Sequence, residues 1–118
     1  MTDQAITWNE ETPPFKLSER AEAAWKRWAA DAIDAGTLHS GTLNGFCQFV
    51  EALADCERLR ETIERDGVLL ESGSGAVKSH PALNTLEAAK RTAMQWAKEY
   101  ALTGASAHAM SKPRRGGL

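Results

Sequence analysis

Apolar residues recur at helical spacing in three long stretches of the chain. The first stretch begins after Ser18, whose hydroxyl suits a helix N-cap, and stops at Gly36, a residue type common just after helix C-termini. Within it, four apolar residues follow at intervals of four, three and four positions: Ala21, Trp25, Trp28 and Ala32. This spacing places them on one face, which predicts a first helix between Ser18 and Gly36.

The second stretch, about residues 42–66, carries two apolar stripes. They are Leu43, Phe46, Val50 and Leu53, and Phe49, Cys56, Leu59 and Ile63. At about 1.5 Å per residue this helix would be roughly 35–40 Å long. Arg60 with Glu64 and Glu61 with Arg65 are pairs of opposite charge at a helical spacing. Two stripes need two packing partners, and we expect one inside the chain and consider a neighbouring copy for the other.

A hairpin and a third helix follow. Gly67 ends the second helix, and Val68–Glu71 and Ala76–Lys78 are strand candidates around a Ser-Gly-Ser-Gly loop. Pro81 is typical of a first helical position, and helical apolar spacing continues to Tyr100. The predicted fold class is mainly α, with three main helices and a short β-hairpin between the second and third.

Three parts are expected along the 118 residues. Residues 1–17 contain Pro13-Pro14 and form an extended arm, which Trp8 and Phe15 are suited to anchor on a core or on a neighbouring subunit. Residues 18–110 form a helical domain, ending in a short helical turn over Ala105–Met110. Residues 111–118 form a flexible basic tail. Without an apolar run near the ~18 residues of a membrane span, or a hydrophobic leader, we expect an intracellular protein and no membrane partner.

The segment GVLLESGSGAVKSHP resembles a phosphate-binding loop only in outline. That motif is G-x-x-x-x-G-K-[ST], whereas Val77 precedes Lys78 here and the spacing from Gly73 is one residue short. Phosphate-binding loops also belong to parallel sheets of several strands, and this chain has two strand candidates. The segment is therefore predicted to be a hairpin loop leading into a helix.

Other catalytic and metal-binding patterns are also missing from the sequence. His39, His80 and His108 are widely spaced, and Cys47 and Cys56 are nine residues apart, on opposite sides of a helix. The cysteines are expected to be buried small apolar residues. We therefore predict that the chain is not an enzyme and has no metal site and no cofactor.

Charge divides the chain into an acidic part and a basic part. Residues 1–75 contain seven Lys and Arg against fourteen Asp and Glu, and residues 76–118 contain seven against two. Such asymmetry indicates that the basic end faces a polyanion or an acidic partner surface.

The order of these features resembles the small subunit of phage terminases over about residues 13–110. The matching segments are Gly36-Thr37-Leu38, Asp66-Gly67, Lys78-Ser79-His80-Pro81-Ala82-Leu83, and Leu102-Thr103 through Ser106. The family's Leu-Gly-Leu-Thr-Pro-x-Ser-Arg ending is altered here: Ala101 replaces its Gly, Gly104 its Pro and Ala107 its Arg.

The resemblance implies a non-catalytic packaging factor, with residues 18–110 as its helical oligomerisation and DNA-packaging domain. Such proteins assemble into rings, bind viral double-stranded DNA in the host cell cytoplasm during phage assembly, and pass it to the large subunit, which holds the ATPase and nuclease. The predicted DNA contacts are Lys78, Lys90, Arg91, Lys98, Lys112, Arg114 and Arg115, with Glu87 as a candidate ion-pair partner for Arg91. The predicted interface of the homo-oligomeric ring consists of Trp25, Trp28, Phe46, Phe49, Leu53, Trp96 and Tyr100.

Two alternatives remain from the sequence. A small helical transcriptional regulator would need a helix-turn-helix. Its only candidate turn is Gly36–Gly41, and the helix that follows starts Thr42-Leu43-Asn44-Gly45-Phe46, which is poor in Arg and Lys. The other alternative is a helical virion or adaptor protein without a nucleic-acid role, which the net charge of −2 slightly favours.

Overall fold

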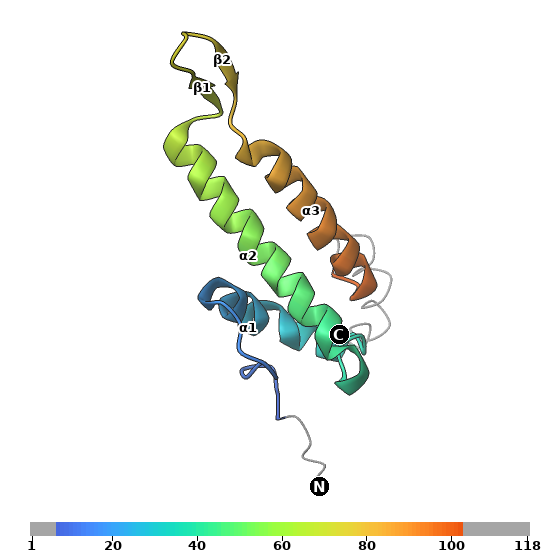
Figure 1. The fold of residues 1–118 in the computed structure, drawn as a ribbon. Coiled ribbons are helices and arrows are strands. Elements are labelled where there is room, and N and C mark those ends of the chain that lie inside the picture. The colour runs from blue at the N-terminus through green and yellow to red at the C-terminus, as the bar shows by residue number, and fades with distance from the viewer. Residues whose placement is uncertain (1–6, 103–118) are drawn as a thin grey trace, which may run out of the picture.

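Two long antiparallel helices carry a β-hairpin at one end and a further helix packed across the other end (Figure 1). The computed structural model describes residues 7–102. Its elements are α1 (Glu19–Asp34), the 3₁₀ turn η1 (Ser40–Thr42), α2 (Leu43–Asp66), β1 (Leu69–Glu71), β2 (Val77–Ser79) and α3 (Ala82–Glu99). The mainly α fold with a hairpin between its second and third helices is thus confirmed. The turn expected over Ala105–Met110 and the tail lie outside the described residues.

Both ends of α1 follow the local signals in the sequence. The Ser18 hydroxyl oxygen accepts a hydrogen bond from the backbone N–H of Ala21 at 3.2 Å. At the other end, the N–H groups of Gly36 and Thr37 donate to the carbonyls of Ile33 and Ala32. This pair of bonds is a Schellman motif, and Gly36 has the positive φ of +80° that the motif requires.

Arg20 joins α1 to α2 by bridging two carboxylates. Its guanidinium lies 2.8 Å from Glu57 and 2.7 Å from Glu61. Two carboxylates four residues apart on a helix repel each other, and the shared cation offsets that repulsion. The hydrogen bond from Arg20 also lowers the pKa of Glu61.

His80 joins the end of α2 to the start of α3. Its Nδ1 accepts a hydrogen bond from the backbone N–H of Ala82 at 3.0 Å. The proton of the neutral ring is then on Nε2, which lies 3.0 Å from the Asp66 carboxylate and donates to it. Pro81 lies one residue before α3 rather than at its first position. Because one buried ring contacts both helices, it fixes where α3 begins relative to the end of α2.

The glycine-rich segment is the loop of an antiparallel hairpin, as predicted. Leu69 pairs with Ser79, Leu70 with Lys78, and Glu71 with Val77. Side chains alternate along a strand, so two apolar residues share one face of the hairpin with a carboxylate: Leu69, Val77 and Glu71. The hairpin projects beyond the ends of α2 and α3 (Figure 1).

Two apolar clusters hold the helices together. The first lies at the α1 end and centres on three fully buried side chains, Trp25, Phe46 and Val50. Trp25 makes edge-on ring contacts with Trp8 at 6.2 Å and with Phe46 at 5.2 Å between centroids. Its indole N–H donates to the carbonyl of Asn9 at 2.9 Å. Trp8 and Asn9 therefore pack on the core of their own chain.

The second cluster lies between the hairpin-side halves of α2 and α3. It contains Ala52, Cys56, Leu59, Ile63, Leu86 and Ala93. Both cysteines of the chain are free and buried. Both apolar stripes of α2 are covered by α1 and α3, with Leu53 keeping partial exposure. Inside the chain α2 therefore has two packing partners, α1 and α3, and a neighbouring copy on the second stripe stays a prediction.

Candidate nucleic-acid and subunit interface

Four of the basic residues predicted to contact DNA lie in the described part of the chain, where they are exposed but do not form one patch. Arg91 and Lys98 are seven residues apart on α3, so they share a face about 10 Å apart along the axis. Lys90 is turned by about 100° from Arg91. Lys78 stands apart on β2. Lys112, Arg114 and Arg115 lie outside the described residues.

Ion pairing distinguishes these cations from one another. Lys90 pairs with Glu87, with 3.3 Å between nitrogen and oxygen. The expected Glu87–Arg91 pair is therefore corrected, because Glu87 is engaged by Lys90. Among residues 7–102, no ion pair includes Arg91 or Lys98. These two charges are available to an anionic partner.

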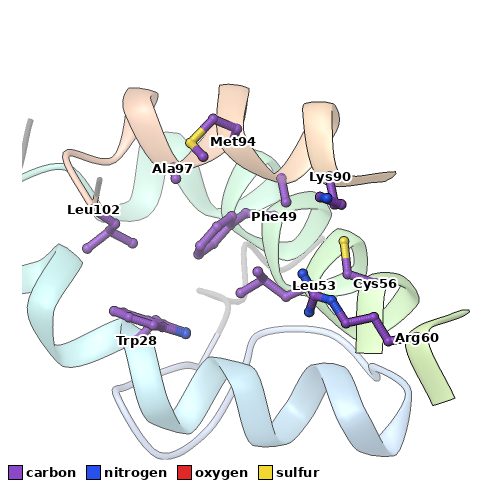
Figure 2. Close-up of a pocket in the computed structure, with 10 residues that line it drawn as sticks. Trp28, Phe49, Leu53, Cys56, Arg60, Lys90, Met94, Ala97 and Leu102 are labelled. Carbon is purple, nitrogen blue, oxygen red and sulfur yellow. The ribbon is translucent and has the colours of Figure 1, made fainter. Parts of the chain in front are cut away.

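A groove of about 370 Å³ opens between the three helices. It is lined by Trp28 of α1, Phe49, Leu53, Cys56 and Arg60 of α2, Lys90, Ala93, Met94 and Ala97 of α3, and Leu102. Figure 2 shows Trp28 and Leu102 at one end and the two cations, Arg60 and Lys90, at the other. Burial raises the pKa of the Cys56 thiol, which keeps it protonated and uncharged. The groove is thus an apolar trough with a positively charged end.

Comparison with known proteins identifies the family of the chain. A family model described as phage terminase, small subunit, matches residues 21–116. The chain belongs to the phage terminase small subunit family. No curated protein and no solved structure matches it. The match confirms the resemblance found in the sequence, and it implies action in the infected host cell.

The interface residues predicted for this terminase small subunit fall into two groups. Trp25, Phe46, Phe49 and Tyr100 are buried in the first apolar cluster of their own chain. Trp28, Leu53 and Trp96 are only partly buried. The first four are covered by contacts inside their own chain, although Phe49 also lines the groove. An interface role remains a prediction for all seven residues, of which Trp28, Leu53 and Trp96 keep the most exposed surface.

Arg60 of the terminase small subunit lines the groove, whereas the sequence pattern predicts an ion pair between Arg60 and Glu64. Helical spacing pairs it with Glu64, and Glu61 with Arg65, but α1 brings Arg20 to Glu61 and Arg65 instead contacts Asp66 at 3.1 Å. Within residues 7–102 no ion pair includes Arg60. A signal was present: Phe49, Leu53, Cys56 and Arg60 follow at intervals of four, three and four. That spacing places the guanidinium at the end of an apolar stripe.

The first turn of α2 is covered, which bears on the helix-turn-helix alternative. Leu43 and Phe46 are buried. Gly45 lies so close to α3 that a β-carbon there would come within 2.6 Å of the Tyr100 hydroxyl and 2.8 Å of the Trp96 ring. A recognition helix presents this end to a DNA groove. The end of α3 covers the Gly45 side of this turn, which counts against α1 and α2 of the terminase small subunit as a DNA-reading helix-turn-helix.

Two further findings concern only the described part of the terminase small subunit. Residues 7–102 contain no group of three or more His, Cys, Asp or Glu arranged to hold a metal ion. In the same residues, no helix is long and apolar enough to cross a membrane.

Proposed function

We propose that this terminase small subunit binds viral double-stranded DNA and presents it to the large subunit, with no catalytic activity of its own. The observation that carries the proposal is two exposed cations on one face of α3, Arg91 and Lys98, which take part in no ion pair within residues 7–102, in a chain of this family. Two cations on one face can neutralise two phosphates of the same DNA molecule, and phosphate contacts supply most of the affinity in sequence-independent binding. Lys78, Lys90, Lys112, Arg114 and Arg115 remain predicted additional contacts.

Assembly of copies into a ring in the host cytoplasm is the second part of the proposal. A few cations per chain bind weakly, but a ring repeats them at fixed spacing around one DNA molecule. The partly exposed Trp28, Leu53 and Trp96 supply apolar surface for contacts between copies. Light scattering after size exclusion tests this part: a single species of several chains is expected, and a monomer at all concentrations would contradict it.

The test of DNA binding is a salt titration with a labelled duplex, read by fluorescence anisotropy. Replacing Arg91 and Lys98 by Gln should weaken binding and make log K less dependent on log salt, with the slope smaller by about one for each phosphate that the variant no longer neutralises. The weakening should be similar for unrelated duplexes, because phosphate contacts carry no base information.

A matched control removes the same charge elsewhere. Lys26 and Arg58 are also exposed but pair with Glu22 at 3.6 Å and with Asp55 at 3.5 Å. Replacing these two by Gln should leave the salt slope unchanged. An equal weakening by both double variants would mean that only net charge matters, and no binding at low salt would contradict the proposal. A third variant, Arg114→Gln with Arg115→Gln, tests the tail separately.

Modulation of the large subunit follows from the same role. We expect the small subunit to change the ATPase or nuclease rate of its large subunit when DNA is present. The measurement is that rate with and without the small subunit, and an unchanged rate over a wide range of concentrations would remove this part of the proposal.

A further inference from the structure

The hairpin leaves an apolar surface uncovered. Val68, Leu69 and Val77 are 54%, 63% and 61% exposed. Leu69 and Val77 share a face with Glu71, which pairs directly with Val77 across the two strands. Clustered aliphatic side chains on a projecting element indicate a contact surface rather than ordinary solvated surface.

The groove offers a matching surface on the same chain. Its walls are apolar, and Met94 on its rim is 55% exposed. Arg60 and Lys90 lie at its hairpin-side end. The hairpin face presents two aliphatic side chains and one carboxylate. The groove presents an apolar trough, the guanidinium of Arg60, which takes part in no ion pair within residues 7–102, and Lys90, which pairs with Glu87. The two surfaces are therefore complementary in apolar character and in charge.

A chain cannot place its own hairpin in its own groove. Arg60 is six residues before the end of α2 and Phe49 is seventeen, so the groove lies about 9–26 Å below that end. The hairpin projects in the opposite direction (Figure 1). The helix between them is continuous, and the His80–Asp66 contact fixes the junction. Any contact between the two surfaces is therefore a contact between copies.

We propose that the hairpin of one copy inserts into the groove of a second copy, with Leu69 and Val77 against the apolar walls and Glu71 facing Arg60 and Lys90. Each copy would give its hairpin to one neighbour and receive a hairpin from another. Such a head-to-tail interface generates a ring where the rotation closes. The inference rests on the proposed ring assembly and names the surfaces that build it.

Other occupants fit the groove less well. Residues 103–118 start beside Leu102, but they contain Lys112, Arg114 and Arg115 and no acidic residue, so the cationic end of the groove would repel them. Phe15 is also 43% exposed and follows two glutamates in the sequence, but it is a single aromatic side chain. It supplies a control rather than a second proposal.

Cross-linking between copies tests the contact directly. In a background of Cys47→Ala and Cys56→Ala, one chain carries Leu69→Cys and another carries Met94→Cys; both new thiols are at exposed positions. Mixed and treated with a short bifunctional maleimide, they should give a band of twice the chain mass. A mixture of Phe15→Cys with Met94→Cys should not give this band.

Charge reversal tests the same contact without a reagent. Arg60→Glu and Glu71→Arg should each raise the concentration at which the assembly dissociates by about tenfold, measured by light scattering. The double reversal should restore most of the affinity, whereas Arg58→Glu should have little effect.

The outcomes separate this inference from the proposed function. A monomer in solution would contradict ring assembly and the inference together. An oligomer that shows no 69–94 cross-link, or no rescue by the double reversal, would overturn the inference alone and assign the groove to another occupant.

Discussion

Ala101 occupies a backbone conformation that favours glycine. Its φ is +60°, and the N–H groups of Ala101 and Leu102 donate to the carbonyls of Lys98 and Ala97. This repeats at the end of α3 the Schellman motif that Gly36 forms at the end of α1. The left-handed conformation costs a residue with a β-carbon about 1–2 kcal/mol.

Exchanging glycine and alanine at positions 36 and 101 should have opposite effects on stability. Gly36→Ala should lower the free energy of unfolding by about 1 kcal/mol, although nothing lies within 4 Å of the new β-carbon. Ala101→Gly should raise it by about 0.5 kcal/mol, because relief of the backbone exceeds the cost of about 0.8 kcal/mol for removing a buried methyl group. Urea unfolding measures both. Ala88→Gly, at an exposed position inside α3, should cost about 1 kcal/mol, and a similar cost for Ala101→Gly would contradict the prediction.

Gly45 is required by the close approach of α2 and α3. A β-carbon there would meet the Tyr100 hydroxyl and the Trp96 ring at distances that no side-chain carbon tolerates. We expect Gly45→Ala to destabilise the chain by about 2 kcal/mol, even though alanine is the better helix former. Gly73→Ala is the control, since nothing lies within 4 Å of its new β-carbon. Equal melting temperatures for the two variants would refute the explanation.

A residue's role can be predicted from the sequence when the residue acts on groups close to it along the chain. Ser18 and Gly36 act on backbone groups within a few residues, so the sequence shows their roles. Trp25 and Trp28 are three residues apart on one helix face, yet Trp25 is fully buried and Trp28 lines the groove. Their difference is set by where α3 lies, which helical spacing does not contain.

At the scale of elements, the junction of α2 and α3 predicts a response to acid. Hydrogen bonds from Arg65 and from His80 lower the pKa of Asp66 below its usual value. The folded state therefore binds this proton less readily than the unfolded chain does. The stabilisation is present above the unfolded pKa, about 4, and is lost as pH falls through the folded pKa.

A variant isolates this contribution. Asp66→Asn should make the melting temperature less dependent on pH below about 4. Some acid dependence should persist, because the pKa of Glu61 is also lowered. Glu64→Gln removes one exposed carboxylate that takes part in no ion pair within residues 7–102 and should leave the profile unchanged. Identical profiles for Asp66→Asn and the parent chain would show that the junction does not couple to acid.

Element boundaries were largely predictable, and ion pairs were not. The helix ends follow capping residues and glycines that act locally, and the hairpin follows its loop residues. The pair predicted for Glu61 within α2 was wrong because Arg20 of α1 reaches it with a two-pronged guanidinium. A sequence shows which charges are four residues apart, but not which helix crosses over them.

At the scale of the whole molecule, the hairpin is separable from the core. Its strands pair with each other, and its exposed side chains contribute nothing to the two apolar clusters. Replacing residues 70–78 by a short Gly-Ser loop should therefore change the melting temperature by only a few degrees. If the hairpin joins neighbouring copies, the same variant should run as a monomer. A variant that unfolds would show that the hairpin belongs to the fold, which circular dichroism would detect.

The two apolar clusters differ in the side chains that they bury. The first contains rings from α1, α2 and α3, and the second contains small and aliphatic residues between two helices. All four tryptophans, Trp8, Trp25, Trp28 and Trp96, lie in or against the first cluster. Intrinsic fluorescence therefore reports on one half of the molecule, whereas circular dichroism reports on both. If the hairpin half opens first, the chain will still look folded by fluorescence after part of its helical signal has disappeared.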